Sequence, residues 1–271
     1  MRATDNISDE CVLFHKNNRM FTGFSRVLGM YSTVLLVLAM SLLLACRQNA
    51  PEHAGVVAIE CLEETYQSLP KIHHSSAPSW QKLEAVEIGN QVWMKNNLET
   101  DTFLNGDLIP QARTAEEWLR AGIEGKPAWC YYLDNECLGL FSGKLYNFFA
   151  IEDPRGIAPL GWHVATDEDW NRLERTLDGD LGDKLKSTEG WLDGGKGTNE
   201  SGFDGRPGGM RYYDGTFFYY GHYGFWWTSS DVVIEHAHIR NLIHDYGSDI
   251  FHNKAGKRAG LSVRCIKNYH K

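Results

Sequence analysis

The sequence predicts an α+β fold with short strands, two main helices and long ordered loops. Two segments carry helix-capping signals, and one of them is followed by apolar residues at helical spacing. Other segments are short, alternate between apolar and polar residues, and are bounded by turn residues. After position 191 the chain is rich in glycine and large aromatics, which suits short strands and ordered loops.

Residues 1–45 are predicted to be upstream residues and a lipoprotein signal peptide. The apolar run 34–44 is too short for a membrane span, which needs about 20 apolar residues, but suits the centre of a signal peptide. The segment Leu-Leu-Ala-Cys ending at Cys46 resembles the bacterial lipobox, in which a lipid is attached to the cysteine. We therefore expect translation from Met20 and lipidation of Cys46. The alternative is a signal anchor in which Cys46 is an ordinary thiol.

Residues 46–82 contain several prolines and serines without a periodic pattern, and are predicted to be a tether. The folded domain is expected over residues 83–271. It begins with a hairpin over residues 86–93, in which alternating residues flank the turn signal Gly89-Asn90.

The next elements are short. Residues 114–120 are predicted to be a helix, because Thr114 can cap it and Glu117 can close a capping box. Residues 129–133 are a predicted strand, and the apolar segment 143–150 is expected to be buried.

The strongest helix signal begins at Thr166, the predicted N-cap. Asp169 lies at the third helical position, and acidic residues suit the positive end of the helix dipole. Trp170, Leu173 and Leu177 then fall on one face at helical spacing. The sequence therefore predicts an amphipathic helix that packs on the core.

Two elements remain. Residues 181–186 are predicted to form a second short helix or turn. Residues 261–267 are the predicted last strand, in which apolar residues alternate with Ser262 and Arg264, so that one face is expected to be buried.

An exported chain can form disulfides. Beyond Cys46 and the tether cysteine Cys61, the disulfide candidates are Cys130, Cys137 and Cys265. Cys130 can bridge locally to Cys137, or tie the early domain to the last strand through Cys265. The sequence leaves this choice open.

The segment from Tyr212 to His252 holds more large aromatics and histidines than a short segment buries easily. Tyrosine offers a large contact area with few rotatable bonds, which is typical of binding surfaces. The predicted binding residues are Tyr212, Tyr213, Phe217, Phe218, Tyr219, Tyr220, His222, Tyr223, His236, His238, His244, Tyr246, Asp249, Phe251 and His252.

Seven ordered blocks carry a family resemblance. They are Trp-Cys-Tyr-Tyr at 129–132, Gly-Lys-Leu-Tyr-Asn-Phe-Phe-Ala at 143–150, the Gly-Trp-His-Val-Ala-Thr segment within 158–170, Thr-Asn-Glu-Ser-Gly-Phe at 198–203, Pro-Gly-Gly at 207–209, Phe-Trp-Trp-Thr-Ser-Ser at 225–230 and Ser-Val-Arg-Cys at 262–265. In these blocks the chain resembles the Fibrobacter succinogenes major paralogous domain.

The resemblance implies a C-type lectin-like fold, found in exported lipoproteins or surface proteins with no generally established enzymatic activity. It places five aromatic residues in the core, namely Trp162, Trp170, Phe203, Trp226 and Trp227. It also implies that Asn199, Glu200 and Ser201 organise the loop before the aromatic segment.

Metal and catalytic motifs are weak. The sugar-binding triplets of calcium-dependent lectins are absent, although five aspartates offer ligands for a structural calcium: Asp204, Asp214, Asp231, Asp245 and Asp249. His236 and His238 place two imidazoles on one strand face without a specified third ligand. Acidic residues at 116–117 and 167–169 are better explained by helix capping than by glycoside hydrolysis. The family is also similar to the domain of the formylglycine-generating enzyme, which needs two nearby redox-active cysteines late in its chain. Only Cys265 lies in that region here, so we expect this activity to be absent. We expect no catalytic residue.

The segment after Pro-Gly-Gly is often asparagine-rich in related domains. Most of the amino acids that stand there in this chain have a codon that is reached from an asparagine codon by changing one adenine. This is the pattern expected of a diversity-generating retroelement, which mutates template adenines. The alternative, which the sequence favours, is ordinary drift of surface loops. The flanking DNA decides between them, since the retroelement requires a nearby reverse transcriptase.

The formal net charge of −8 and the lack of a basic block argue against nucleic-acid partners. We expect a lipid-anchored cell-envelope protein, in the outer membrane, that binds an extracellular protein or glycan. The competing classes are an envelope polysaccharide-acting enzyme, which needs converging carboxylates, and a structural surface or appendage component.

Overall fold

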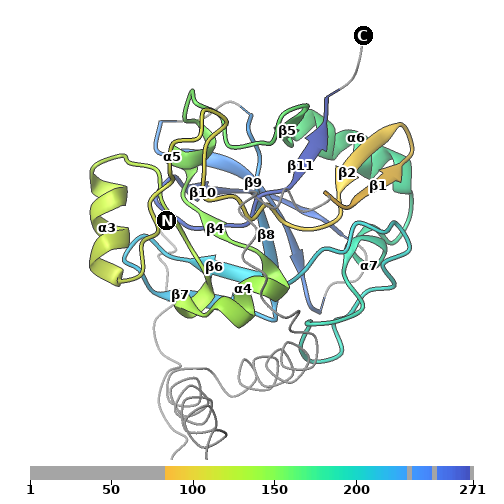
Figure 1. Ribbon diagram of the computed structural model, residues 1–271. Helices are drawn as coiled ribbons and strands as arrows, with labels where there is room; N and C mark the ends of the chain where they lie inside the picture. Colours follow the sequence, from red (N-terminus) through yellow and green to blue (C-terminus); the bar gives the residue numbers. More distant parts are fainter. Residues whose placement is uncertain (1–82, 231–233, 246–248, 269–271) are drawn as a thin grey trace, which may run out of the picture. The chain divides into compact units, whose positions relative to one another are not determined.

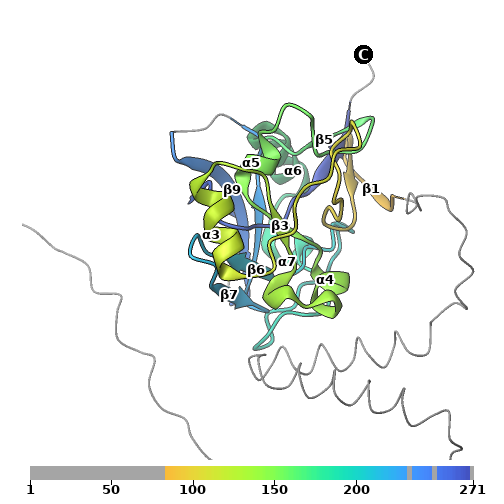
Figure 2. The same ribbon diagram turned by 60° about the vertical axis from the view of Figure 1, so that its left-hand side comes forward.

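A computed structural model describes residues 83–230, 234–245 and 249–268 (Figures 1 and 2). The predicted lipidation residue Cys46, with Cys61, Asp231 and Tyr246, lies outside these residues. Within them, no helix is both long enough and apolar enough to cross a membrane. Helices alternate with small antiparallel sheets, which confirms the predicted α+β class.

The first and last strands of the described domain share one four-stranded sheet. Its order is β1–β2–β11–β5, formed by β1 (Ala85–Ile88), β2 (Gln91–Met94), β11 (Cys265–Lys267) and β5 (Trp162–Val164). The predicted hairpin is confirmed, because β1 pairs with β2 around a turn in which Gly89 has φ +62°. Ile266 pairs with both Trp93 and His163. Strand β11 therefore ties the first hairpin to the middle of the chain.

The remaining strands form three further sheets. One has the order β10–β9–β8, formed by β10 (Phe251–Gly256), β9 (His236–Ile243) and β8 (Tyr223–Trp227). The other two are pairs, formed by β3 (Trp129–Cys130) with β4 (Leu145–Tyr146), and by β6 (Gly208–Arg211) with β7 (Phe217–Tyr220).

Two helices are longer than the others, as predicted. They are α3 (Ala115–Ile123) and α6 (Asp167–Leu177), which lie on opposite sides of the domain with the sheets between them (Figures 1 and 2). The predicted capping box of Thr114 with Glu117 and the predicted N-cap Thr166 are confirmed, and the structure adds a capping box of Thr166 with Asp169. The shorter helices are α4 (Glu136–Ser142), α5 (Phe148–Ile151), α7 (Leu181–Leu185) and the 3₁₀ turn η1 (Tyr132–Asp134).

Aromatic side chains fill the centre of the domain. The rings of Trp93 and Trp170 lie 5.1 Å apart, and Phe203 packs edge-on against both, 5.7 Å from the first and 5.4 Å from the second. Trp226 and Trp227 are fully buried, as predicted from the family resemblance. Trp162 differs, because it is only half-buried and packs on the margin of the core.

Two strand predictions need correction. The strand expected over 129–133 stops at Cys130, because the chain turns into η1, where Leu133 has a left-handed φ of 53°. The last strand, expected over 261–267, begins only at Cys265, and Ser262 and Arg264 before it are as buried as the apolar residues that alternate with them. Arg264 donates hydrogen bonds to the carbonyls of residues 94, 95 and 203 and to Asn97 Oδ1, at 2.6–3.1 Å, so a polar face is buried without losing its partners.

The predicted disulfides are not formed among the described cysteines. Cys130 packs in a cluster with Trp118 and Tyr132, whereas Cys265 belongs to a different cluster with Tyr146. Burial raises the pKa of both the Cys130 and the Cys265 thiol to about 12. These two thiols are therefore packing residues with low reactivity at neutral pH.

Candidate functional site

Four large aromatic side chains form a contiguous exposed surface beside β6, β7 and the turn between them. Tyr212, Tyr213, Phe218 and Tyr219 are between 43% and 49% exposed. Ring centroids lie 4.6 Å apart for Tyr212–Tyr213, 6.1 Å for Tyr212–Phe218 and 5.8 Å for Phe218–Tyr219. We call these four residues the aromatic patch. Apolar patches of this kind on a soluble domain commonly mark interaction sites.

A backbone distortion in β7 explains why two consecutive aromatics both face solvent. Side chains normally alternate between the faces of a strand. Tyr219 has φ +68°, and Gly209, which lies opposite it, has φ +61°, so that the β6–β7 pairing skips this position. Bulky residues seldom adopt this conformation, which costs about 1–3 kcal/mol. The fold therefore tolerates local strain where it presents Phe218 and Tyr219 together.

A buried arginine holds the turn that carries Tyr212 and Tyr213. Arg211 donates to the carbonyls of Ala112 at 2.7 Å, Thr114 at 2.9 Å and Gly215 at 3.1 Å. A Cβ atom at Gly215 would lie 2.6 Å from Ala115, which shows how closely the turn packs on the start of α3. The turn is therefore attached to α3 at both of its ends, and the patch stands on a rigid frame.

Other predicted binding residues support the patch from beneath. Tyr220 is only 8% exposed, and its ring packs on Tyr132 at a centroid distance of 4.8 Å. Phe217 is half-buried and contacts the same ring at 5.0 Å. Tyr223 is half-buried, with its ring 4.8 Å from that of Tyr219. Tyr220 is thus a core residue, because the left-handed backbone at Tyr219 breaks the alternation and turns the next side chain inward, and the prediction that Tyr220 contacts ligand is corrected.

Two predicted histidines belong to an ionic network between the β9–β10 sheet and α6. His238 Nδ1 lies 3.0 Å from Asp167, and His252 Nε2 lies 2.9 Å from Glu174. Between them the buried Arg240 contacts Asp167 at 2.7 Å and Glu174 at 3.3 Å. An open cavity of about 480 Å³ is lined by Asp167, His238, Arg240 and His252. The histidines are therefore engaged by protein carboxylates, although one side of the network faces solvent.

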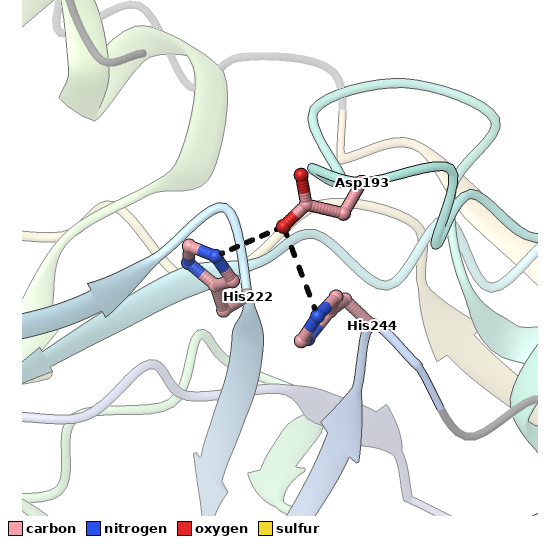
Figure 3. Close-up of side chains that lie close together, drawn as sticks. All are labelled: Asp193, His222 and His244. Carbon is pink, nitrogen blue, oxygen red and sulfur yellow. Dashed lines mark ion pairs between the residues drawn. The ribbon is translucent and has the colours of Figure 1, made fainter. Parts of the chain in front are cut away.

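A second side-chain cluster joins residues far apart in the sequence. The Asp193 carboxylate lies 3.5 Å from Nε2 of His222 and 4.0 Å from Nε2 of His244 (Figure 3). The two imidazole rings are nearly perpendicular, with centroids 4.8 Å apart. One ligand atom from each residue lies within 4.8 Å of the other two. This is the group among the described residues whose donor atoms could hold a metal ion.

The remaining predicted site residues are dispersed. His236 and Asp249 are exposed, and Phe251 is half-buried at the start of β10. Among the aspartates that offer oxygen ligands for calcium, Asp204 pairs with Arg206 at 2.9 Å and Asp214 accepts a hydrogen bond from the Thr216 backbone at 2.9 Å. The structure gathers no calcium cluster from the described aspartates. We predict no bound cofactor, with a structural calcium as the less favoured alternative.

A cavity of about 450 Å³ elsewhere on the domain contains carboxylates. Glu99 and Asp204 both line it, together with Asn97 and Arg206. Burial raises the pKa of Glu99, although the Lys144 ammonium opposes the shift. Asp204 is held by Arg206 through two hydrogen bonds of 2.9 and 3.1 Å. A raised pKa would suit Glu99 to act as a general acid. The second carboxylate, Asp204, is engaged by Arg206, so the cavity does not present the pair of carboxylates that an enzyme acting on polysaccharide needs.

Sequence reasoning missed three residues that shape these sites. Arg211 and Arg240 are fully buried cations, and no local pattern distinguishes them from surface arginines. Asp193 lies in a Leu-Asp-Gly-Gly turn, whose glycines signal a turn but not its neighbours. Each becomes visible only through contacts with distant segments.

One of three comparisons with known proteins found a match. The model of the Fibrobacter succinogenes major domain matches residues 86–267. No curated protein and no solved structure matches the chain. The matched residues include both clusters described above, so the aromatic patch and the Asp193 cluster lie within the family domain.

Proposed function

Because the chain belongs to the Fibrobacter succinogenes major domain family, we propose that it is a non-catalytic binding module that presents the aromatic patch to a protein outside the cell. The observation that carries the proposal is the patch itself, four exposed neighbouring rings, two on the strained strand β7 and two on the turn before it. Tyrosine and phenylalanine at such sites supply large contact areas at a small entropic cost.

The support beneath the patch strengthens the proposal. Arg211 fixes the turn that carries Tyr212 and Tyr213, and Tyr132 supports the strand that carries Phe218 and Tyr219. A preorganised surface loses less conformational entropy on binding than a mobile loop. A central aromatic cluster on a rigid frame has the features of a binding hot spot.

Ring orientation favours a protein over a glycan. Tyr212 and Phe218 stand almost perpendicular, at 88°, while Tyr212 and Tyr213 are tilted by 49°. Sugars stack an apolar C–H face on the face of an aromatic ring, whereas the tilted rings here form an uneven surface. Uneven aromatic surfaces match the pockets and knobs of protein partners.

We also infer a C-type lectin-like fold and a lipid anchor at Cys46. The fold is supported by the family resemblance and by the sheet that brings β1 and β11 together through β2. Superposition of an experimental structure on a C-type lectin domain tests it. The anchor is supported by the lipobox-like segment and would place the module in the cell envelope, in the outer membrane.

The binding proposal is tested by replacing two patch residues whose side chains are exposed, Tyr213 and Phe218. Tyr213→Ser with Phe218→Ser is expected to weaken partner binding at least about tenfold, since hot-spot residues contribute about 2 kcal/mol or more each. The melting temperature should stay within about 2 °C of the wild type, because both side chains are exposed. Affinity cross-linking on intact cells with quantitative mass spectrometry, beside a glycan array, measures the effect.

Two control variants separate a loss of binding from a loss of folding. Leu160→Ser removes another apolar side chain, 91% exposed, and should leave binding unchanged. Tyr220→Ala should lower the melting temperature, because it opens a cavity against Tyr132. If the wild type binds a glycan and the double variant does not, the ligand of the aromatic patch is a glycan and not a protein. Partner capture that survives in the double variant would place the binding face elsewhere.

A further inference from the structure

We propose that Asp193, His222 and His244 form a binding site for a divalent transition metal ion, with zinc as the best match. The three residues come from the loop after α7, the turn between β7 and β8, and the end of β9 (Figure 3). This site is separate from the aromatic patch, although the two are joined by the β7–β8 turn, where His222 N donates to the Tyr219 carbonyl at 3.0 Å. The inference does not depend on the proposed protein ligand.

Backbone contacts hold the three segments together without any metal. Leu192 N donates to Gly221 O at 2.9 Å, which places Asp193 beside the turn that carries His222. His244 N donates to His222 O, also at 2.9 Å. A Cβ atom at Gly195 would lie 2.3 Å from the His244 carbonyl oxygen, so only glycine lets the loop approach this closely. The ligands are therefore prearranged by the fold.

The orientation of the histidines suits coordination through Nε2. His222 Nδ1 lies 3.3 Å from the Tyr220 carbonyl oxygen, which can only accept, so Nδ1 can donate a hydrogen bond there while Nε2, which faces Asp193, binds a metal ion. Metal-bound histidines commonly donate their other nitrogen in this way. His244 Nδ1 is buried without a hydrogen bond, although the Asp245 carboxylate lies 3.7 Å away. A small shift of Asp245 would supply the same support there.

The donor set selects the metal. Two imidazole nitrogens and one carboxylate match zinc and related ions, whereas calcium and magnesium prefer sites made wholly of oxygen. Ligand atoms around tetrahedral zinc stand about 3.3 Å apart, given bond lengths of about 2.0–2.1 Å. The donor atoms lie 3.5 and 4.0 Å from the Asp193 carboxylate and all within 4.8 Å of one another, so metal binding requires the three side chains to draw together.

The site also has an open side. The Asp193 side chain is 68% exposed and that of His222 is 37% exposed. Three protein ligands leave the fourth tetrahedral position to water or to a donor atom from a bound molecule. Asp193 holds a left-handed φ of 52°, a strained conformation of the kind that clusters at functional sites.

Titration of the purified, chelator-treated chain with zinc chloride tests the proposal. Wild type is expected to bind one zinc ion at this site, with a rise in melting temperature, and calcium chloride should produce no comparable rise. His222→Ala and His244→Ala should each weaken this binding by at least about tenfold. Isothermal calorimetry and thermal shift, in parallel, measure both effects.

Two further variants make the result decisive. Asp193→Asn removes a largely exposed carboxylate, so it should fold normally and still weaken zinc binding, even if a histidine variant proves unstable. His236→Ala is the matched control, because this exposed histidine on β9 lies outside the cluster. The proposal is overturned if the wild type shows no zinc binding tighter than about 100 μM, which corresponds to roughly 5.5 kcal/mol. It is equally overturned if Asp193→Asn and both histidine variants bind like the wild type, or if only His236→Ala loses zinc.

Discussion

At the scale of single residues, the pair Gly209 and Tyr219 decides the character of the aromatic patch. Both have left-handed backbones at facing positions of the β6–β7 pair. The sequence marks Gly209 as scaffold and Tyr219 as a binding residue, but it does not show that they depend on each other. The glycine permits the close approach that lets Tyr219 turn outward.

Replacing this glycine is expected to disturb fold and patch together. Gly209→Ala puts a Cβ atom 2.6 Å from Phe218 O and 2.7 Å from Tyr220 N, at a φ of +61°. Backbone atoms cannot move aside cheaply, so we expect a loss of about 2 kcal/mol in the free energy of unfolding. Urea denaturation at constant pH measures it.

Gly256→Ala serves as the comparison in the same experiment. Gly256 lies in β10, where an added Cβ atom meets nothing within 4 Å and no positive φ is required. Alanine there should be neutral or slightly stabilising, because it reduces the entropy of the unfolded chain. If both alanine variants were equally stable, the close backbone approach at Gly209 would not be the source of strain.

At the scale of elements, α6 shows how a local signal acquires a tertiary role. The sequence predicted its N-cap Thr166 and its acidic first turn, and both are confirmed. The structure adds His163 of β5, whose Nε2 lies 3.0 Å from the capping carboxylate of Asp169. At the other face, Arg240 binds carboxylates of the same helix. Acidic residues of α6, the capping Asp169 among them, therefore also attach the helix to two sheets.

The His163–Asp169 contact should make stability depend on pH. The hydrogen bond to Asp169 raises the pKa of His163 above its usual value. Burial pushes the pKa of Asp169 upward, but hydrogen bonds from His163 and Thr166 outweigh it and lower the pKa. A raised histidine pKa adds stability that is complete below about pH 6.5 and is lost as the pH rises through the folded-state value.

The measurement compares wild type with His163→Gln in urea denaturation between about pH 5.5 and 8.5. The free energy of unfolding of the wild type should exceed that of His163→Gln by the largest amount at the acidic end of this window, where His163 is charged and Asp169 is still ionised. The advantage should shrink toward the alkaline end. The difference between the two curves of unfolding free energy against pH removes the contribution of the other histidines. If the two curves run parallel over this pH range, the contact between His163 and Asp169 is not charge-assisted.

At the scale of the whole molecule, distant parts of the chain meet in one domain. Strand β11 joins β2 and β5, Arg211 joins β6 to the start of α3, and Asp193 meets two histidines from the second half of the domain. The family match at residues 86–267 covers these junctions. The proposed attachment point, Cys46, lies outside that match.

The proposed attachment predicts that one cysteine carries a lipid. Cys46→Ser should abolish incorporation of a labelled fatty acid and move the protein from the membrane fraction to the soluble fraction, since acyl chains anchor by burying their methylene groups. Expression in a Gram-negative bacterium, with labelling and cell fractionation, measures both. Cys61→Ser is the control and should retain the label. Persistent labelling of Cys46→Ser would rule out this attachment point.

By itself, the sequence determined the fold class, the two capped helices, the first hairpin and the region that holds the aromatic surface. These follow from local spacing, capping residues and turn residues, which act within a few positions. Only the tertiary structure decided that Tyr219 is exposed while Tyr220 is buried, and that Asp193 meets His222 and His244. The physical reason is that exposure and coordination depend on what another segment places opposite a residue, and a single segment carries no record of its distant neighbours.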